Sequence, residues 1–204
     1  MDEPIPTEQS VFVRSGHGGF IRAADRIGVV FRPIRENGPA RLVPAAWTVV
    51  AGAVAGIVSE HALFVAHVVM SALLVGFVAA SWNEMSSGTL RAWKLVILAG
   101  TPATIAGVLG FLALNGTIGL PAEPLLALAL YAWILLPAVG LIYTGRRAEE
   151  TALAYDVGGV CSLAGAVGVT LAAAPIEVVA GIGVVGVGQT MGIVAATVVE
   201  SRVE

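Results

Sequence analysis

The sequence predicts an all-α, polytopic integral membrane bundle with six transmembrane helices and cytoplasmic N- and C-termini, preceded by a short amphipathic interfacial helix. Hydrophobic residues make up 57% of the 204 positions and charged residues only 12%, with a mean hydropathy of +0.88. A soluble protein carries roughly a quarter charged residues. The Lys and Arg residues are also distributed in a way that fits six spans. This composition excludes an ordinary soluble domain.

The stretch 42–82 is about twice as long as the roughly 20 apolar residues that one membrane crossing needs. Ser59, Glu60 and His61 interrupt it. A carboxylate beside an imidazole is costly at the centre of a bilayer, so we expect the chain to turn there and form a helical hairpin. Four more apolar stretches follow, within a membrane domain at 42–199 and before a cytoplasmic end at 200–204. The predicted spans are 42–59, 62–82, 95–114, 125–143, 153–173 and 178–199.

The basic residues predict the orientation of these spans. If the N-terminus is cytoplasmic, all eleven Lys and Arg residues fall on the inner side, as the positive-inside rule requires. This asymmetry predicts a multi-pass protein of the cell membrane. Aromatic residues at the inner ends of the spans predict an interfacial belt. They are Trp47, Trp82, Trp93, Tyr143 and Tyr155.

Residues 1–41 are predicted to form a basic cytoplasmic tail. Within this tail, the segment 19–32 places Phe20, Ile27 and Phe31 at helical spacing on one side and arginines on the other. This pattern predicts an interfacial helix that lies on anionic lipid headgroups. The alternative is a docking helix for a cytoplasmic partner.

Few polar side chains lie inside the predicted spans, and in lipid each needs a partner or a purpose. We expect His67 to be a neutral histidine bonded to a neighbouring helix. A metal or haem ligand role is the alternative, but His61, six residues earlier, lies on a different side of the helix. Asp156 is expected to have a structural role near a helix N-terminus. Gln189 is expected to form a hydrogen bond across a helix contact.

Each predicted outer turn carries one glutamate: Glu60, Glu123 and Glu177. If the three hairpins cluster, these carboxylates would gather at one mouth beside His61 and attract a cation. The alternative is that outer loops merely tolerate acidic residues and avoid basic ones.

Prolines and glycines predict how the spans bend and pack. Pro102 and Pro137 each remove a backbone hydrogen bond, so both are expected to kink their helices, with a gating hinge as the alternative. Spans five and six share a short turn and are rich in glycine. Because small residues let helix backbones approach closely in lipid, these two spans are predicted to form a tightly packed antiparallel pair.

The sequence contains no Ser/His/Asp set, HExxH, GxSxG or phosphate-binding loop. We therefore expect a non-enzymatic protein without a cofactor, a metal site or a nucleic-acid partner. The expected partners are the lipid bilayer and either the other subunits of a membrane complex or a separate ATPase. The predicted function is that of a membrane subunit of a larger complex that serves transport. The alternative is a stand-alone small transporter or permease for a hydrophobic solute or a cation.

The predicted layout, a surface helix followed by six spans with both ends inside, resembles that of the membrane subunits of some exporters driven by a separate ATPase. The resemblance covers topology alone. It ends at the turn between spans five and six, where some of those subunits carry a long outer segment and this chain has about four residues.

Overall fold

The structure is a computed structural model, and it describes residues 41–82, 85, 88–148 and 151–203. The predicted cytoplasmic tail and its interfacial helix at 19–32 lie outside these residues. The described chain consists of helices joined by turns and contains no strand. The all-α class predicted from the sequence is therefore confirmed.

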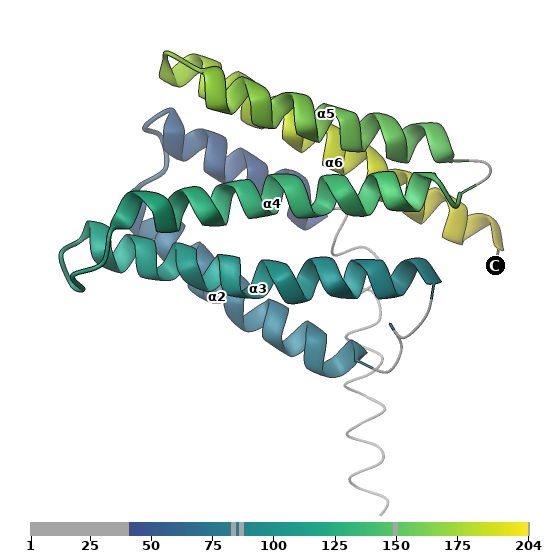
Figure 1. Cartoon of the computed structure of the whole chain (residues 1–204), viewed down its shortest axis with the longest axis horizontal. Helices are drawn as coiled ribbons and strands as arrows, with labels where there is room; N and C mark the ends of the chain where they lie inside the picture. Colours follow the sequence, from purple (N-terminus) through teal and green to yellow (C-terminus); the bar gives the residue numbers. More distant parts are fainter. Residues whose placement is uncertain (1–40, 83–84, 86–87, 149–150, 204) are drawn as a thin grey trace, which may run out of the picture. The chain divides into compact units, whose positions relative to one another are not determined.

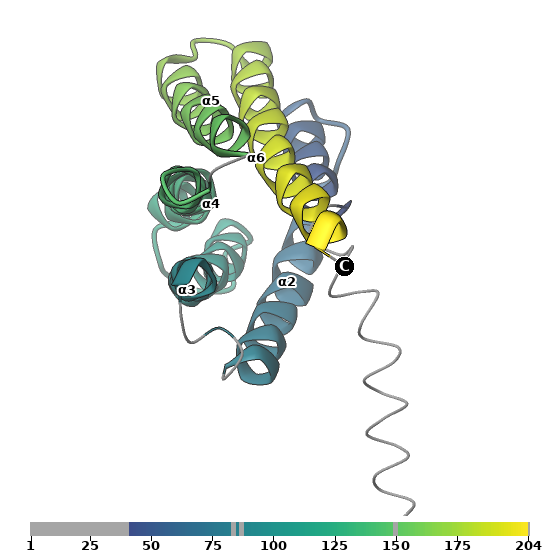
Figure 2. The same cartoon turned by 90° about the vertical axis from the view of Figure 1, so that its right-hand side faces the viewer.

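Among the described residues, five helices are long and apolar enough to cross a membrane, and they run alternately in opposite directions (Figure 1). A shorter apolar helix, Arg41–Val54, precedes them. The five are α2 (Glu60–Ser81), α3 (Gly88–Leu114), α4 (Ala122–Gly145), α5 (Ala152–Leu171) and α6 (Pro175–Val203). In order of decreasing contact, the packed pairs are α5 with α6, α3 with α4, α4 with α5, α2 with α3, and α4 with α6 (Figure 2).

The first predicted span, 42–59, differs from the observed helix, which ends at Val54. Gly56 has a φ of +74°, its N–H donates to the Ala53 carbonyl at 3.0 Å, and the Ile57 N–H donates to the Gly52 carbonyl at 2.8 Å. These two bonds form the Schellman motif, which ends a helix at a glycine in the left-handed conformation. The described part of this helix is thus shorter than a full membrane crossing requires.

The predicted turn between the first two spans is confirmed, and α2 begins directly after it. The side chain of Ser59 accepts a hydrogen bond from the Ala62 N–H at 3.2 Å. A serine at this position satisfies a backbone donor that has no partner within the helix. The chain therefore leaves one helix through a glycine cap and enters the next through a serine cap.

A second glycine cap ends α3. Gly116 has a φ of +72°, its N–H donates to the Ala113 carbonyl, and the Thr117 N–H donates to the Leu112 carbonyl. The ends of these two helices lie at the same end of the bundle, where the chain turns from one helix into the next (Figure 1). A third glycine with a positive φ, Gly88, begins α3.

We predict that Gly56→Ala lowers the free energy of unfolding by about 1 kcal/mol, because a Cβ disfavours the left-handed conformation. Unfolding in mixed micelles with increasing SDS measures the change. Gly76→Ala is the control, since Gly76 lies within α2 and a Cβ there would meet nothing within 4 Å. This second change should stabilise the protein by up to about 1 kcal/mol. If Gly56→Ala is as stable as the wild type, Gly56 does not end the helix in the left-handed conformation.

The predicted close pairing of the last two spans is confirmed. A Cβ on Gly158 of α5 would lie 2.5 Å from the carbonyl oxygen of Gly188 in α6, and one on Gly165 would lie 2.6 Å from that of Gly181. Side chains at these positions would therefore overlap the backbone of the partner helix. The two helices touch backbone to backbone along this line, which only glycine allows.

Helix α2 lies at the periphery and is tied to α3 at its C-terminal end. Only 6% of its membrane-length segment is buried, whereas the other four range from 33% to 44%. Lys94 of α3 donates to the Trp82 carbonyl at 2.8 Å and lies 3.7 Å from the centroid of the Trp82 ring. The ammonium group thereby satisfies a terminal carbonyl of α2, where the negative end of the helix dipole favours a cation.

Candidate functional site in the bundle interior

Gln189 of α6 joins three helices inside the bundle and is 4% exposed. Its Oε1 accepts a hydrogen bond from Trp47 Nε1 of the Arg41–Val54 helix at 2.9 Å. Its Nε2 donates to the carbonyl oxygens of Trp133 and Ile134 in α4, at 3.0 Å and 3.4 Å. The expected hydrogen bond of Gln189 across a helix contact is therefore present.

The carbonyl of Trp133 is open to Gln189 because of Pro137. In an α-helix each carbonyl accepts from the N–H four residues later. For Trp133 that residue is Pro137, which is buried in α4 and has no N–H. The amide of Gln189 takes the place of the missing backbone donor, as neighbouring helices commonly do for prolines in membrane helices.

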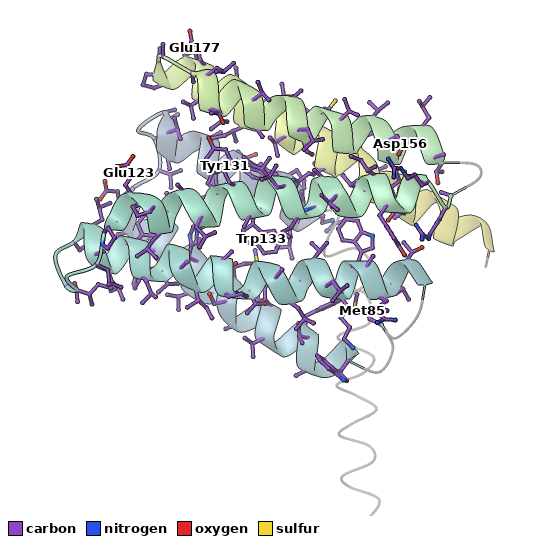
Figure 3. All side chains as sticks on the ribbon, in the orientation of Figure 1. Met85, Glu123, Tyr131, Trp133, Asp156 and Glu177 are labelled. Carbon is purple, nitrogen blue, oxygen red and sulfur yellow. The ribbon has the colours of Figure 1, made fainter. Side chains whose placement is uncertain are left out.

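The same hydrogen-bond chain continues from α4 to α3. Trp133 Nε1 donates to Thr104 Oγ1 at 2.8 Å, and Thr104 Oγ1 donates to the Gly100 carbonyl at 2.9 Å. A Cβ on Gly100 would lie 2.9 Å from the Trp133 ring, so this glycine makes room for the indole. Trp47, Gln189, Trp133 and Thr104 thus form a continuous set, here named the polar chain, that links four helices. Figure 3 labels Trp133, the member of this set that lies between α3 and α6 in the chain of bonds.

Apolar side chains surround the polar chain. Ile134, Ile182 and Val185 are each 0% exposed, and they form one buried cluster with Trp47 and Ala166. Hydrogen bonds are strong in such surroundings, and a polar group left without a partner there is costly. The polar chain is therefore suited to fixing how these helices pack.

The sequence identified Gln189 but not its partners. Trp47 and Tyr155 were expected in the interfacial belt, yet they are only 8% and 7% exposed, and Trp47 is bonded to Gln189, so these two placements were wrong. Trp82, by contrast, is 51% exposed. The signal for Trp133 was already present in the sequence, because a proline within a span leaves open the carbonyl four residues before it.

His67 is half-buried in α2, and its partner differs from the predicted one. Its Nδ1 lies 2.9 Å from the Leu63 carbonyl of its own helix rather than bonding to a neighbouring helix. Across the interface α3 offers Gly107 and Phe111, and the Phe111 ring meets the imidazole edge-on with centroids 5.3 Å apart. Because this part of α3 presents no polar side chain, the imidazole uses the carbonyl four residues back, a common local bond in helices. His61 is exposed, and its ring packs near Phe64.

Glu60, Glu123 and Glu177 lie at one end of the bundle, each in the first turn of its own helix: α2, α4 and α6 (Figure 1). Glu177 Oε2 accepts hydrogen bonds from the N–H groups of Ala173 and Ala174, at 2.6 Å and 3.3 Å. Within the described chain, no three His, Cys, Asp or Glu residues are grouped so that they could hold a metal ion. The hypothetical cation site formed by Glu60, Glu123 and Glu177 together is therefore not seen among the described residues. Carboxylates are favoured in the first turn of a helix by its dipole.

Asp156 lies near the start of α5, at the junction with the end of α4 (Figure 3). It is half-buried, and its carboxylate packs directly against Gly145, where a side chain would overlap it. The structural role expected for Asp156 stays a prediction.

The helix lengths and the buried polar chain together define a multi-pass helical membrane protein. Comparisons of this chain with protein-family models, curated proteins and solved structures give no match.

Proposed function

We propose that this protein is a non-catalytic, multi-pass subunit of a larger complex in the cell membrane, and that the complex serves transport. The observation that carries the proposal is how the buried polar side chains of the described chain are hydrogen-bonded. Thr104, Thr144 and Gln189 each bond to a neighbouring helix, which supports a role in holding helices together. Ser162 bonds to its own helix. The buried polar residues are Thr104, Thr144, Ser162 and Gln189.

The periphery of α2 supports the presence of a partner. Among the labelled helices α2 packs on α3 alone, and large apolar side chains cover its other faces. Gly76 on this helix has open space around it, so another helix could approach its backbone closely. We propose that a neighbouring subunit packs against α2. The exposed large residues are Val65, Val68, Val69, Leu73 and Val75.

We further propose that the Arg41–Val54 helix belongs to the first of six spans and that both termini are cytoplasmic. The directions of the helices support this orientation. Arg91 and Lys94 follow the end of α2, and Arg146 and Arg147 follow α4. This end of the bundle lies opposite the three glutamates (Figure 1). By the positive-inside rule the basic end faces the cytoplasm.

Site-specific photocrosslinking in native membranes tests the role of α2. A photoreactive residue at Val69 or Leu73, each 52% exposed, is expected to give one discrete protein adduct. That adduct should match a protein that co-purifies in equal amount in mild detergent. The control position is Val167 of α5, which is 57% exposed and should react with lipid alone.

A different result would favour the second function. If the α2 positions react only with lipid and the protein purifies alone, the subunit proposal fails. The stand-alone transporter or permease for a hydrophobic solute or a cation would then be the better proposal. If the partner is an ATPase, the complex is a permease with a separate energy source.

A further inference from the structure

Pro137 gives α4 a weak point in its C-terminal half. It follows a run of fifteen helical residues and precedes the last turns of the helix, which ends at Gly145. Proline removes one backbone hydrogen bond and pushes its ring against the carbonyl four residues earlier, so helices bend there. The carbonyls of Trp133 and Ile134 lie four and three residues before Pro137, and both accept from Gln189 Nε2.

The amide of Gln189 is itself held in place from α6 and from the Arg41–Val54 helix. Its Oε1 accepts from Trp47 Nε1 at 2.9 Å, and the Trp47 side chain packs closely on Gly186, one turn before Gln189. A rotation of the amide would break its bonds to two helices at once. The donor that replaces the lost backbone bond therefore comes from a fixed point outside α4.

We propose that Gln189 is a latch on the Pro137 bend. While Nε2 is bonded to the Trp133 carbonyl, the two halves of α4 are held at one angle. When this bond is broken, α4 pivots at Pro137 and its contact with α6 opens. The device is independent of the subunit role proposed above, since it depends only on contacts within this chain.

Hydrogen exchange of the protein in nanodiscs, followed by mass spectrometry, tests the latch. Gln189→Met keeps the approximate size of the side chain and removes both donor and acceptor. Amides at 133–141 are then expected to exchange about five to ten times faster, as the loss of a hydrogen bond of ordinary strength implies. Thr190→Val is the matched neighbour control, because the Thr190 hydroxyl bonds only to the Gly186 carbonyl of its own helix. It should leave exchange in α4 unchanged.

A second experiment restores the backbone N–H that Pro137 lacks. It distinguishes a specific effect of Gln189 on α4 from a general loss of packing. In a Pro137→Ala background the N–H of residue 137 can bond to the Trp133 carbonyl. Adding Gln189→Met there should change exchange in α4 by less than about twofold. Equal increases with and without Pro137 would overturn the proposal. If Gln189→Met alone gives no folded protein, recovery by Pro137→Ala supports the latch and failure to recover overturns it.

Trp47→Phe provides one more control. It removes the hydrogen bond to Gln189 Oε1 and leaves the Nε2 donor free to bond to α4. Exchange should rise in the Arg41–Val54 helix and should rise in α4 by much less than in Gln189→Met, because Nε2 keeps its partners in α4 but loses the bond that holds the amide. An increase in α4 as large as that of Gln189→Met would overturn the proposal, since it would show that α4 responds to any loosening of the interior.

Discussion

Replacing Gly165 by alanine is expected to lower the free energy of unfolding by about 3 kcal/mol, the upper end of the usual cost of overpacking. The new Cβ would lie 2.6 Å from the Gly181 carbonyl oxygen and 3.0 Å from the Val185 backbone nitrogen. Because both are backbone atoms, no side-chain rotation can relieve the overlap, and α5 must move away from α6. SDS titration of the purified protein, followed by circular dichroism, measures the loss.

Gly183→Ala is the matched control for this result, since it makes the same substitution in α6, two residues from Gly181. A Cβ at Gly183 would meet nothing within 4 Å, so helix propensity alone should act and stabilise the protein by up to about 1 kcal/mol. The two alanines are thus expected to have opposite signs. If both stabilise, α5 and α6 do not approach as closely as the structure shows.

Trp133→Ala is expected to lower the free energy of unfolding by about 3 kcal/mol, because it removes the ring that packs on Gly100 and leaves a cavity between α3 and α4. It also removes the donor to Thr104, which is 2% exposed. Trp133→Phe keeps most of the ring and should cost about 1 kcal/mol, the value of one hydrogen bond. The same SDS titration gives both values.

Trp82→Ala tests whether the loss at Trp133 depends on its position in the interior. Trp82 is 51% exposed and contacts Lys94 through its ring face. Losing an exposed cation–π contact should cost less than about 1 kcal/mol. A loss at Trp82 as large as that at Trp133 would contradict the central place of Trp133 in the packing.

The sequence predicted well what depends on composition along one helix. Continuous apolar runs gave the five membrane-length helices, and the glycines of the last two spans gave the close α5–α6 pair. A lone amide in an apolar span must find a partner, and this requirement gave the cross-helix bond of Gln189. In each case a local feature of the chain was sufficient.

The end of the first helix was less well predicted. Apolar residues continue through Val58, so hydropathy placed the end of the span at 59. The chain instead turns at Gly56, where φ is +74°. Hydropathy measures how apolar a segment is, whereas the end of a helix depends on the backbone conformation at the glycine cap. Glycine is common in membrane helices, and nothing in the sequence distinguished Gly56, which ends the helix, from Gly52, which lies within it.

The sequence by itself determined that this chain is a multi-pass helical membrane protein, because apolar length and scarce charge are properties of each segment alone. It also determined that α4 has an open carbonyl, since Pro137 lacks an N–H. Only the tertiary structure decided that Gln189 fills that place and that Trp47 is buried beside it. The physical reason is that these helices are apolar on all sides. No periodic pattern marks which face turns inward, so neighbours and rotations are set by close packing between helices.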